Sequence, residues 1–111
     1  MNHEEIRLYC LSLPESEESF PFDAETLVFK HKGKIFAILS LDENPPRINL
    51  KCNPAYALEL REKFNNVVPG YHMNKKHWNT VICSGGINFP LLKKWINDSF
   101  ALIQAKTPKN K

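Results

Sequence analysis

Residues 26–52 read TLVFKHKGKIFAILSLDENPPRINLKC, and this stretch decides the fold. Over its first seven residues, the side chains of Leu27, Phe29 and His31 would point to one side of an extended chain and those between them to the other. Lys32-Gly33 then supplies a tight turn, and residues 35–41 follow as a more apolar strand. This pattern predicts a β-hairpin.

A third strand follows a loop at residues 42–46. Residues 47–52 alternate cleanly, with Ile48, Leu50 and Cys52 on the predicted core side. Three consecutive strands joined by short connections predict an antiparallel meander.

A helix is predicted on the amino-terminal side of the meander. Asn2 can cap it and Glu5 can complete a capping box. Its apolar residues fall at helical spacing, at Ile6, Tyr9, Cys10 and Leu13. We expect residues 15–25 to form an acidic loop in which Phe20 and Phe22 are aromatic anchors.

Two more helices are predicted on the carboxyl-terminal side. Asn53-Pro54 is a strong helix start, followed by a buried stripe of Ala57, Leu60 and Phe64. Short strands are predicted at residues 67–68 and 80–83. The last helix opens at Asn88 or Phe89, and its predicted inner face consists of Leu92, Trp95, Ile96, Ser99 and Ile103.

The element order α-β-β-β-α-β(β)-α predicts an α+β fold, a single antiparallel sheet with its helices packed on one face. Residues 1–105 would form one domain, and residues 106–111 a flexible basic tail. The uncovered face of the sheet would look at solvent or at a partner. It would carry Lys30, Lys32, Arg47 and Lys51.

Composition indicates a globular protein, because 42% of its 111 residues are hydrophobic and 24% are charged. The longest apolar run, residues 35–39, is too short to span a membrane. The polar, acidic start does not resemble a signal peptide, so we expect a cytoplasmic protein without a membrane partner. The cysteines are odd in number and widely spaced, which favours three buried, unpaired thiols at Cys10, Cys52 and Cys83.

Charge is distributed unevenly along the chain. Residues 1–29 contain seven acidic side chains and one arginine, whereas residues 30–111 contain fourteen lysines and arginines and five acidic side chains. Such asymmetry suggests a basic surface for a polyanion, shielded at one end by an acidic segment. The alternative is that the charges mix again once the chain has folded.

Residues 74–79 place two lysines and a histidine beside Trp78. This mixture suits nucleic acid, because lysine neutralises phosphate while an aromatic ring can stack on bases; Trp78 could equally pack into the core. His72 and His77 do not have a zinc-site spacing, and Cys83 alone does not complete a ligand set, so no metal site is predicted. Cys52 follows Lys51 at a helix start, but its place on the core side argues against a nucleophile.

The run PGYHMNKKHWNTV at residues 69–81 resembles the signature of the MmcQ/YjbR family. Shorter blocks agree in order and spacing, and the match covers nearly the whole chain. They lie at residues 20–22, 29–30, 33–34, 36–37, 50–52, 60–61 and 97–100, the last with Phe100 where tyrosine is more usual.

The resemblance implies a small bacterial protein with a CyaY-like (frataxin-like) α/β sandwich, of a kind described as DNA-binding with a double-wing arrangement. It supplies no catalytic residues and no cofactor, and we expect a protein that is not an enzyme. An enzyme would have to rely on His72, His77 and Cys83.

Two functions are therefore carried forward. The first is DNA binding with weak sequence specificity, by a monomer or weak homodimer. Its predicted contacts are Lys30, Lys32, Lys34, Arg47, Lys51, Lys75, Lys76, His77 and Trp78. The alternative is a small-molecule or protein-binding domain in which the Tyr71–Trp78 loop forms a pocket rim. Its predicted contacts are Tyr71, His72, Asn74 and Trp78.

Overall fold

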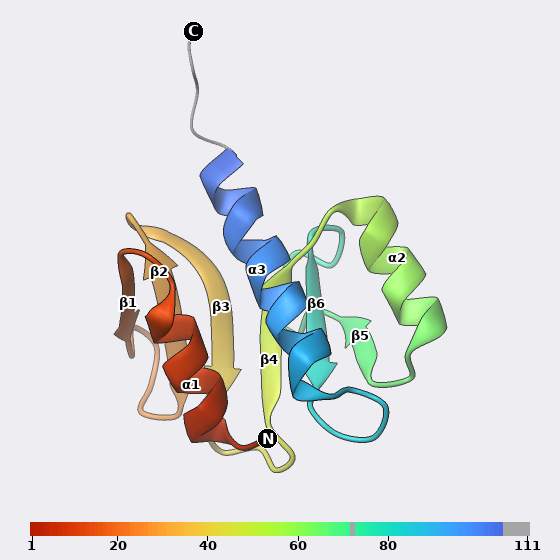
Figure 1. Ribbon diagram of the computed structural model, residues 1–111, viewed down its shortest axis with the longest axis horizontal. Helices are drawn as coiled ribbons and strands as arrows, with labels where there is room; N and C mark the ends of the chain where they lie inside the picture. Colours follow the sequence, from red (N-terminus) through yellow and green to blue (C-terminus); the bar gives the residue numbers. More distant parts are fainter. Residues whose placement is uncertain (72, 106–111) are drawn as a thin grey trace, which may run out of the picture.

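The computed structural model describes residues 1–71 and 73–105, of which the last contributes backbone only (Figure 1). The predicted tail at residues 106–111 and His72 lie outside the described residues. The elements in chain order are α1 (His3–Ser12), β1 (Ser16–Ser19), β2 (Thr26–His31), β3 (Lys34–Ser40), β4 (Arg47–Lys51), α2 (Pro54–Lys63), β5 (Val67–Pro69), β6 (Trp78–Ile82) and α3 (Phe89–Ala105).

The six strands form one antiparallel sheet in the order β1-β2-β3-β4-β6-β5. The predicted meander is confirmed as β2, β3 and β4, and the short strand predicted at residues 67–68 is β5. The register His31↔Lys34 closes the β2–β3 hairpin, and β4 leads directly into α2. The α+β prediction is therefore correct.

The helices cover one face of the sheet (Figure 1). α3 crosses β3 and β4, α1 lies over β1 and β3, and α2 lies beside β5 and β6. The predicted inner face of α3 is buried throughout, and it packs on the alternating apolar residues of the strands, such as Phe29, Leu39 and Ile48. The opposite face of the sheet, here called the open face, carries none of the helices of the described residues.

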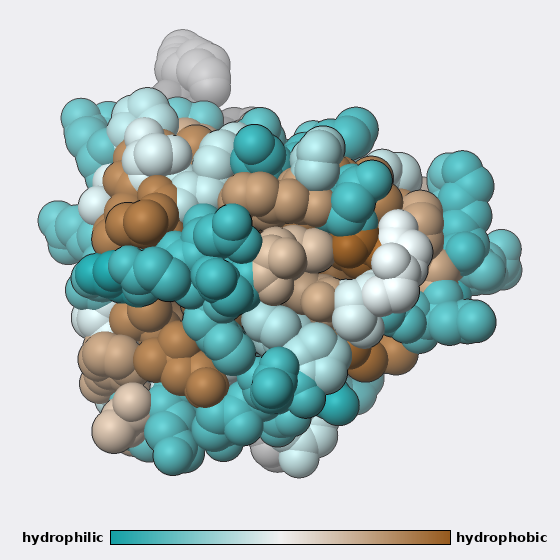
Figure 2. Space-filling model, turned by 60° about the horizontal axis from the view of Figure 1, so that its bottom comes forward, coloured by the Kyte–Doolittle hydropathy of each residue, from teal (hydrophilic) through white to brown (hydrophobic). Residues whose placement is uncertain are grey.

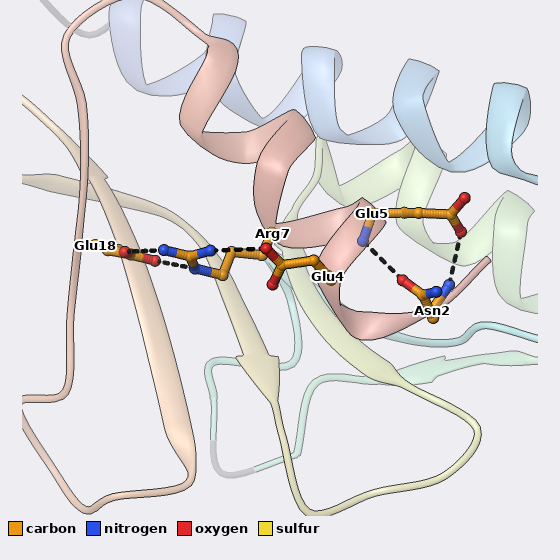
Figure 3. A network of polar contacts seen from close by, with 5 residues as sticks. All are labelled: Asn2, Glu4, Glu5, Arg7 and Glu18. Atoms are coloured by element: carbon orange, nitrogen blue, oxygen red, sulfur yellow. Dashed lines mark hydrogen bonds and ion pairs between the residues drawn. The ribbon is translucent and has the colours of Figure 1, made fainter.

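Two asparagines start helices as the sequence predicts. The side-chain oxygen of Asn2 accepts from Glu5 N at 2.8 Å, and Asn2 N donates to Glu5 Oε1 at 2.9 Å, which completes a capping box (Figure 3). Asn53 caps α2 by accepting from the backbone N–H groups of Ala55 and Tyr56.

The loop predicted at residues 15–25 is partly wrong, because its beginning forms β1. The sequence SEES offers no apolar alternation, yet it pairs with β2 from Ser16↔His31 to Ser19↔Val28. Glu18 faces α1 and accepts two hydrogen bonds from Arg7, from Nε at 2.7 Å and Nη2 at 2.6 Å (Figure 3). β1 is therefore held by its cross-strand hydrogen bonds with β2 and by the ion pair between Arg7 and Glu18. It has no alternation of apolar residues from which a strand could be predicted.

The predicted aromatic anchors are also wrong. Phe20 is 49% exposed and Phe22 is 68% exposed, so neither side chain is anchored in the core. Because β1 ends at Ser19 and β2 begins at Thr26, both residues lie in the connection between these two strands.

A buried hydroxyl joins α3 to the sheet. Beyond the pair Ala37↔Leu50, strands β3 and β4 no longer pair directly. Ser99 lies between them: its Oγ donates to Phe36 O at 2.6 Å and accepts from Lys51 N at 2.9 Å. The buried hydroxyl of Ser99 thus supplies hydrogen-bond partners to one backbone carbonyl and one backbone N–H that do not pair with each other across the strands.

Candidate functional site

The register of the sheet gathers lysines at one end of the strands, here called the basic end. The β2–β3 turn, the end of β4 and the loop before β6 all lie there (Figure 1). Lys51 pairs with Trp78 across β4 and β6, which brings this loop beside the β4–α2 junction. The lysines of the basic end are Lys30, Lys32, Lys34, Lys51, Lys75 and Lys76.

Acidic side chains gather at the other end of the strands, here called the acidic end. The start of α1 and the loops after β1 and β3 meet there: His3 Nε2 lies 2.8 Å from Glu43 O, and Leu41 N donates to Glu25 O at 2.8 Å. Its acidic residues are Glu4, Glu5, Asp23, Glu25, Asp42 and Glu43. Figure 2 brings this end forward and shows brown hydrophobic patches among teal side chains. The charge asymmetry of the sequence therefore survives in part, because Glu15 and Glu17 lie at the basic end, beside Lys32 and Lys30.

Arg47 belongs to the acidic end, although the sequence groups it with the lysines. It begins β4 opposite Ser40, and its Nε lies 3.6 Å from Glu43 Oε1. The whole length of β4 separates it from Lys51. A surface that included Arg47 and the basic end would have to run along the strands.

The basic end includes both faces of the sheet. Lys30 and Lys51 follow core residues in their strands and so lie on the open face, where Lys30 pairs across strands with Glu17. Lys34 pairs with His31 and lies on the helix side. Lys32 does not lie on the open face as predicted, because it occupies the turn with a φ of 51°.

The loop between β5 and β6 is closed by its own polar groups. Lys75 Nζ donates to Gly70 O at 2.9 Å, and Asn74 Oδ1 accepts from Lys76 N at 2.9 Å. Both lysines are exposed. Lys75 therefore commits one of its three N–H donors to the loop, whereas the ammonium group of Lys76 makes no hydrogen bond or ion pair with the described part of the chain.

Arg61 holds this loop against α2, and the sequence analysis did not select it. Its Nε donates to Asn79 Oδ1 at 2.7 Å, and its Nη2 donates to the carbonyl groups of Lys75 and Trp78. The sequence did contain a signal, because Arg61 lies four residues after Ala57 and so shares its buried helical face. A charged residue at that position needs partners, and the loop supplies them.

Gly70 is required by close packing in the same loop. A Cβ atom there would lie 2.8 Å from Trp78 Cβ and 3.0 Å from Trp78 O, closer than atoms in contact tolerate. Gly70 N also donates to Trp78 O at 2.9 Å. The absence of a side chain at Gly70 therefore lets this part of the chain pack directly against Trp78.

The aromatic and polar residues of the loop are divided between core and surface. Trp78 and His77 are half-buried, and His77 O accepts from Cys52 N at 2.7 Å. Trp78 lies on the open face beside Lys51, so it neither enters the core fully nor stands free. Tyr71 is exposed and its backbone N–H donates to Thr80 Oγ1 at 3.0 Å.

Two cavities lie close to the basic end, and neither is lined by Tyr71, Asn74 or Trp78. One, between α2, α3 and β4, has about 20 Å³ of free space, enough for a single water molecule. The other lies between the β2–β3 turn and α3, with about 200 Å³. The predicted pocket rim stays a prediction.

The cysteines are free and buried, as the sequence predicts. Burial raises the pKa of Cys10 and Cys83 to about 12, and burial together with the charge of Asp98 raises the pKa of Cys52 to about 11. These thiols are therefore protonated at neutral pH, which disfavours nucleophilic chemistry.

Two further observations concern only the described residues. No cluster of three or more His, Cys, Asp or Glu side chains there could hold a metal ion. No helix among them is long and apolar enough to cross a membrane.

Comparison with known proteins identifies relatives over most of the chain. The chain is 43% identical to the Escherichia coli O157:H7 protein YbdF over 101 residues, which cover 91% of this chain and 83% of that protein. It is 34% identical to YjbR of Escherichia coli K12, over 78% of this chain and 74% of that protein.

Solved structures share the fold. The crystal structure of the Deinococcus radiodurans protein DR2400 matches with a TM-score of 0.91 at 38% identity, over 98% of this chain and 83% of that one. A crystal structure of a Pseudomonas syringae protein matches with a TM-score of 0.79 at 29% identity, over 92% of this chain and 98% of that one. The YjbR family model matches residues 11–102. The chain belongs to the YjbR family, as its sequence motifs predict.

Proposed function

We propose that this protein is a DNA-binding module without catalytic activity, and that its basic end contacts backbone phosphates. The observation that supports the proposal is the gathering of six lysines from three separate segments at one end of the sheet, beside Glu15 and Glu17, with six acidic residues and Arg47 at the other end. A polarised charge distribution of this kind orients a polyanion toward one end.

The lysines differ in what they can contribute. Lys32 lies 3.6 Å from Glu15, and Lys75 is committed in part to Gly70 O, so both are partly used within the protein. Lys34 and Lys76 are exposed. If about four phosphates are neutralised, the affinity should fall roughly 100-fold between about 50 and 200 mM salt.

Sequence preference should be weak. Arg61, the arginine beside the basic end, is engaged with the loop carbonyls, and Arg47 lies at the acidic end near Glu43. A bidentate arginine is the commonest reader of guanine, whereas lysine acts as a point charge on phosphate. The basic end therefore fits recognition of DNA through its backbone.

Fluorescence anisotropy with a mixed-sequence duplex tests the proposal. Lys76→Ala should weaken binding to every sequence and reduce the slope of log affinity against log salt by about 1. Lys63→Ala is a matched control, because Lys63 is an equally exposed lysine at the far end of α2 that pairs with Glu59.

Two results would contradict the proposal. One is the absence of binding at about 50 mM salt, where phosphate contacts are strongest. The other is an equal loss of affinity in Lys76→Ala and Lys63→Ala, which would show that binding follows net charge and not the basic end.

A further inference from the structure

The larger cavity of the described structure opens between the β2–β3 turn and the last turns of α3. It offers about 200 Å³, the space of several water molecules. Its lining is mostly basic and polar, and consists of His31, Lys32, Lys34, Ile103 and Gln104. The residues of the loop between β5 and β6 do not line this space.

His31 is the most constrained residue of the lining. It is 7% exposed, its Nδ1 lies 2.8 Å from Pro14 O, and its ring meets Phe100 edge-on at 4.7 Å between centroids. Because a carbonyl oxygen only accepts, Nδ1 carries the proton of that hydrogen bond. The other ring nitrogen, Nε2, has no hydrogen-bond partner in the parts of the chain at 1–71 and 73–105. His31 is therefore held in one orientation by Nδ1, and its second ring nitrogen is left for a ligand in the cavity that it lines.

Two lysines add positive charge around the same space. Lys34 is the cross-strand neighbour of His31 and is exposed. Lys32, in the turn between them, is partly balanced by Glu15 at 3.6 Å. The carbonyl end of α3 opposes an anion through its dipole, so the attraction must come from the hairpin side.

We propose that this cavity binds a phosphate group, held by the ammonium groups of Lys32 and Lys34 and by the side-chain amide of Gln104, with Nε2 of His31 donating to it when the ring carries a proton on both nitrogens. A phosphate suits the cavity better than a carboxylate because it offers more acceptor oxygens and more charge to donors that surround it. The inference deepens the proposed function and rests on it only for the source of the phosphate, a DNA backbone or a free phosphate compound.

NMR of the full chain tests the site. The ¹⁵N signals of the histidine rings and the lysine ammonium groups are followed while inorganic phosphate is added, against chloride at equal ionic strength. The His31 Nε2 and Lys34 Nζ signals should shift together and saturate. Lys34→Ala should weaken phosphate affinity by on the order of tenfold, the loss of one charge-assisted contact. Lys63→Ala should leave it unchanged.

A second variant avoids damage to the core. His31→Ala would remove the contact with Phe100, so its failure to bind could reflect unfolding. Gln104→Met keeps the size of an exposed side chain and removes its N–H donors, and it should weaken phosphate binding several-fold.

Three titrations distinguish a DNA backbone phosphate from a free phosphate compound, and they also test the cavity proposal separately from the proposed function. The titrants are inorganic phosphate, a deoxynucleoside monophosphate and a short duplex. Displacement of phosphate by the duplex would support a backbone phosphate at the site. Saturable phosphate binding without any duplex binding would support the cavity and contradict the proposed function. Shifts that stay linear, involve all lysines alike and persist in Lys34→Ala would overturn the cavity proposal.

Discussion

At the basic end of the sheet, cationic side chains satisfy the carbonyl groups of a loop, whereas at the acidic end side-chain oxygens satisfy backbone N–H groups. Arg61 and Lys75 donate to carbonyl oxygens between residues 70 and 78. Asn2 and Asp23 instead accept from the N–H groups of Glu5 and Glu25. Side-chain oxygens accept from N–H groups at the basic end as well, where Asn74 Oδ1 accepts from Lys76 N, so the contacts from cations to carbonyl groups are what distinguish the basic end.

The difference matters for any partner of the basic end. A cation that holds a loop cannot be removed without disturbing that loop, so binding and stability are coupled at Lys75 and Arg61. Lys30 and Lys76 make no such side-chain bond within the described residues. Lys76 therefore reports on a partner most directly, whereas Lys30 also faces Glu17 across β1 and β2, and the tests begin with these two lysines.

The largest effect is expected from reversing charge at each end in turn. Lys30→Glu with Lys76→Glu should lower affinity for duplex DNA by on the order of 100-fold at low salt, because each lost phosphate contact costs roughly tenfold there. The matched variant Glu25→Lys with Asp42→Lys changes charge by the same amount in the opposite direction at the acidic end. It should bind as well as the native protein or slightly better in the same anisotropy assay.

If the variant with two new glutamates loses as much affinity for duplex DNA as the variant with two new lysines gains, the two ends of the sheet do not differ in their contribution to binding. Binding would then depend on total charge, and the gathering of lysines at one end would have no special role. Circular dichroism of both variants checks that each retains the fold.

The next effect concerns the scaffold beneath the basic end. Ser99→Ala removes the hydroxyl that joins Phe36 O and Lys51 N, and leaves a buried carbonyl and a partly buried N–H group without this partner. The free energy of unfolding should fall by about 3 kcal/mol, because each such group costs about 1–3 kcal/mol. Urea unfolding followed by circular dichroism measures the change.

Asn97→Ala provides the control on the same helix. It removes an exposed hydrogen bond from Tyr9 Oη and should cost less than about 1 kcal/mol. A loss in Ser99→Ala no greater than in Asn97→Ala would show that the strands close without the hydroxyl.

A smaller effect on stability is expected at Arg61, where one substitution removes the planar shape of the guanidinium group and keeps its positive charge. Arg61→Lys keeps the charge but removes the planar fork that reaches Asn79, Lys75 O and Trp78 O together. Stability should fall by about 1–2 kcal/mol and DNA affinity several-fold, while the salt slope stays the same. A reduced salt slope would instead make Arg61 a phosphate contact.

Most of the fold could be predicted from the sequence because its strong elements have strong local signals. Alternation marks β2 and β4, and asparagine caps mark the starts of α1 and α2. The buried face of α3 was predicted residue by residue, including Ser99. The sequence pattern did not predict the hydrogen-bond partners of Ser99. The serine has these partners because pairing between β3 and β4 ends after Ala37↔Leu50, and only the folded sheet defines where it ends.

The candidate site was predicted less well, for a physical reason. Charge patterning identifies lysines but not the end of the sheet to which each belongs, and register alone separates Arg47 from Lys51. Arg61 was missed because its partners are carbonyl groups of a distant loop, which have no sequence signature. His31 was predicted on the core side, but its cavity depends on where α3 ends.

The smallest effect tests the strand that patterning missed. Arg7 lowers the pKa of Glu18 through its hydrogen bonds, so the pair stabilises the fold above the ordinary glutamate pKa of about 4.3 and loses this contribution as pH falls through the lowered value. Arg7→Met should cost up to about 1 kcal/mol at pH 7, as expected for a partly exposed pair. The difference from the native protein in urea unfolding should shrink toward pH 3.

Glu4→Gln separates this pair from the other carboxylate near Arg7. Glu4 lies 3.1 Å from Arg7 Nη1 on the exposed surface of α1, so its loss should change stability less than Arg7→Met does (Figure 3). If Arg7→Met costs the same at pH 3 as at pH 7, the guanidinium acts through packing, and the cross-strand bonds to β2 alone hold β1. If the cost disappears at low pH, the ion pair supplies what the sequence SEES lacks in apolar contacts, and an edge strand with no hydrophobic pattern has its physical explanation.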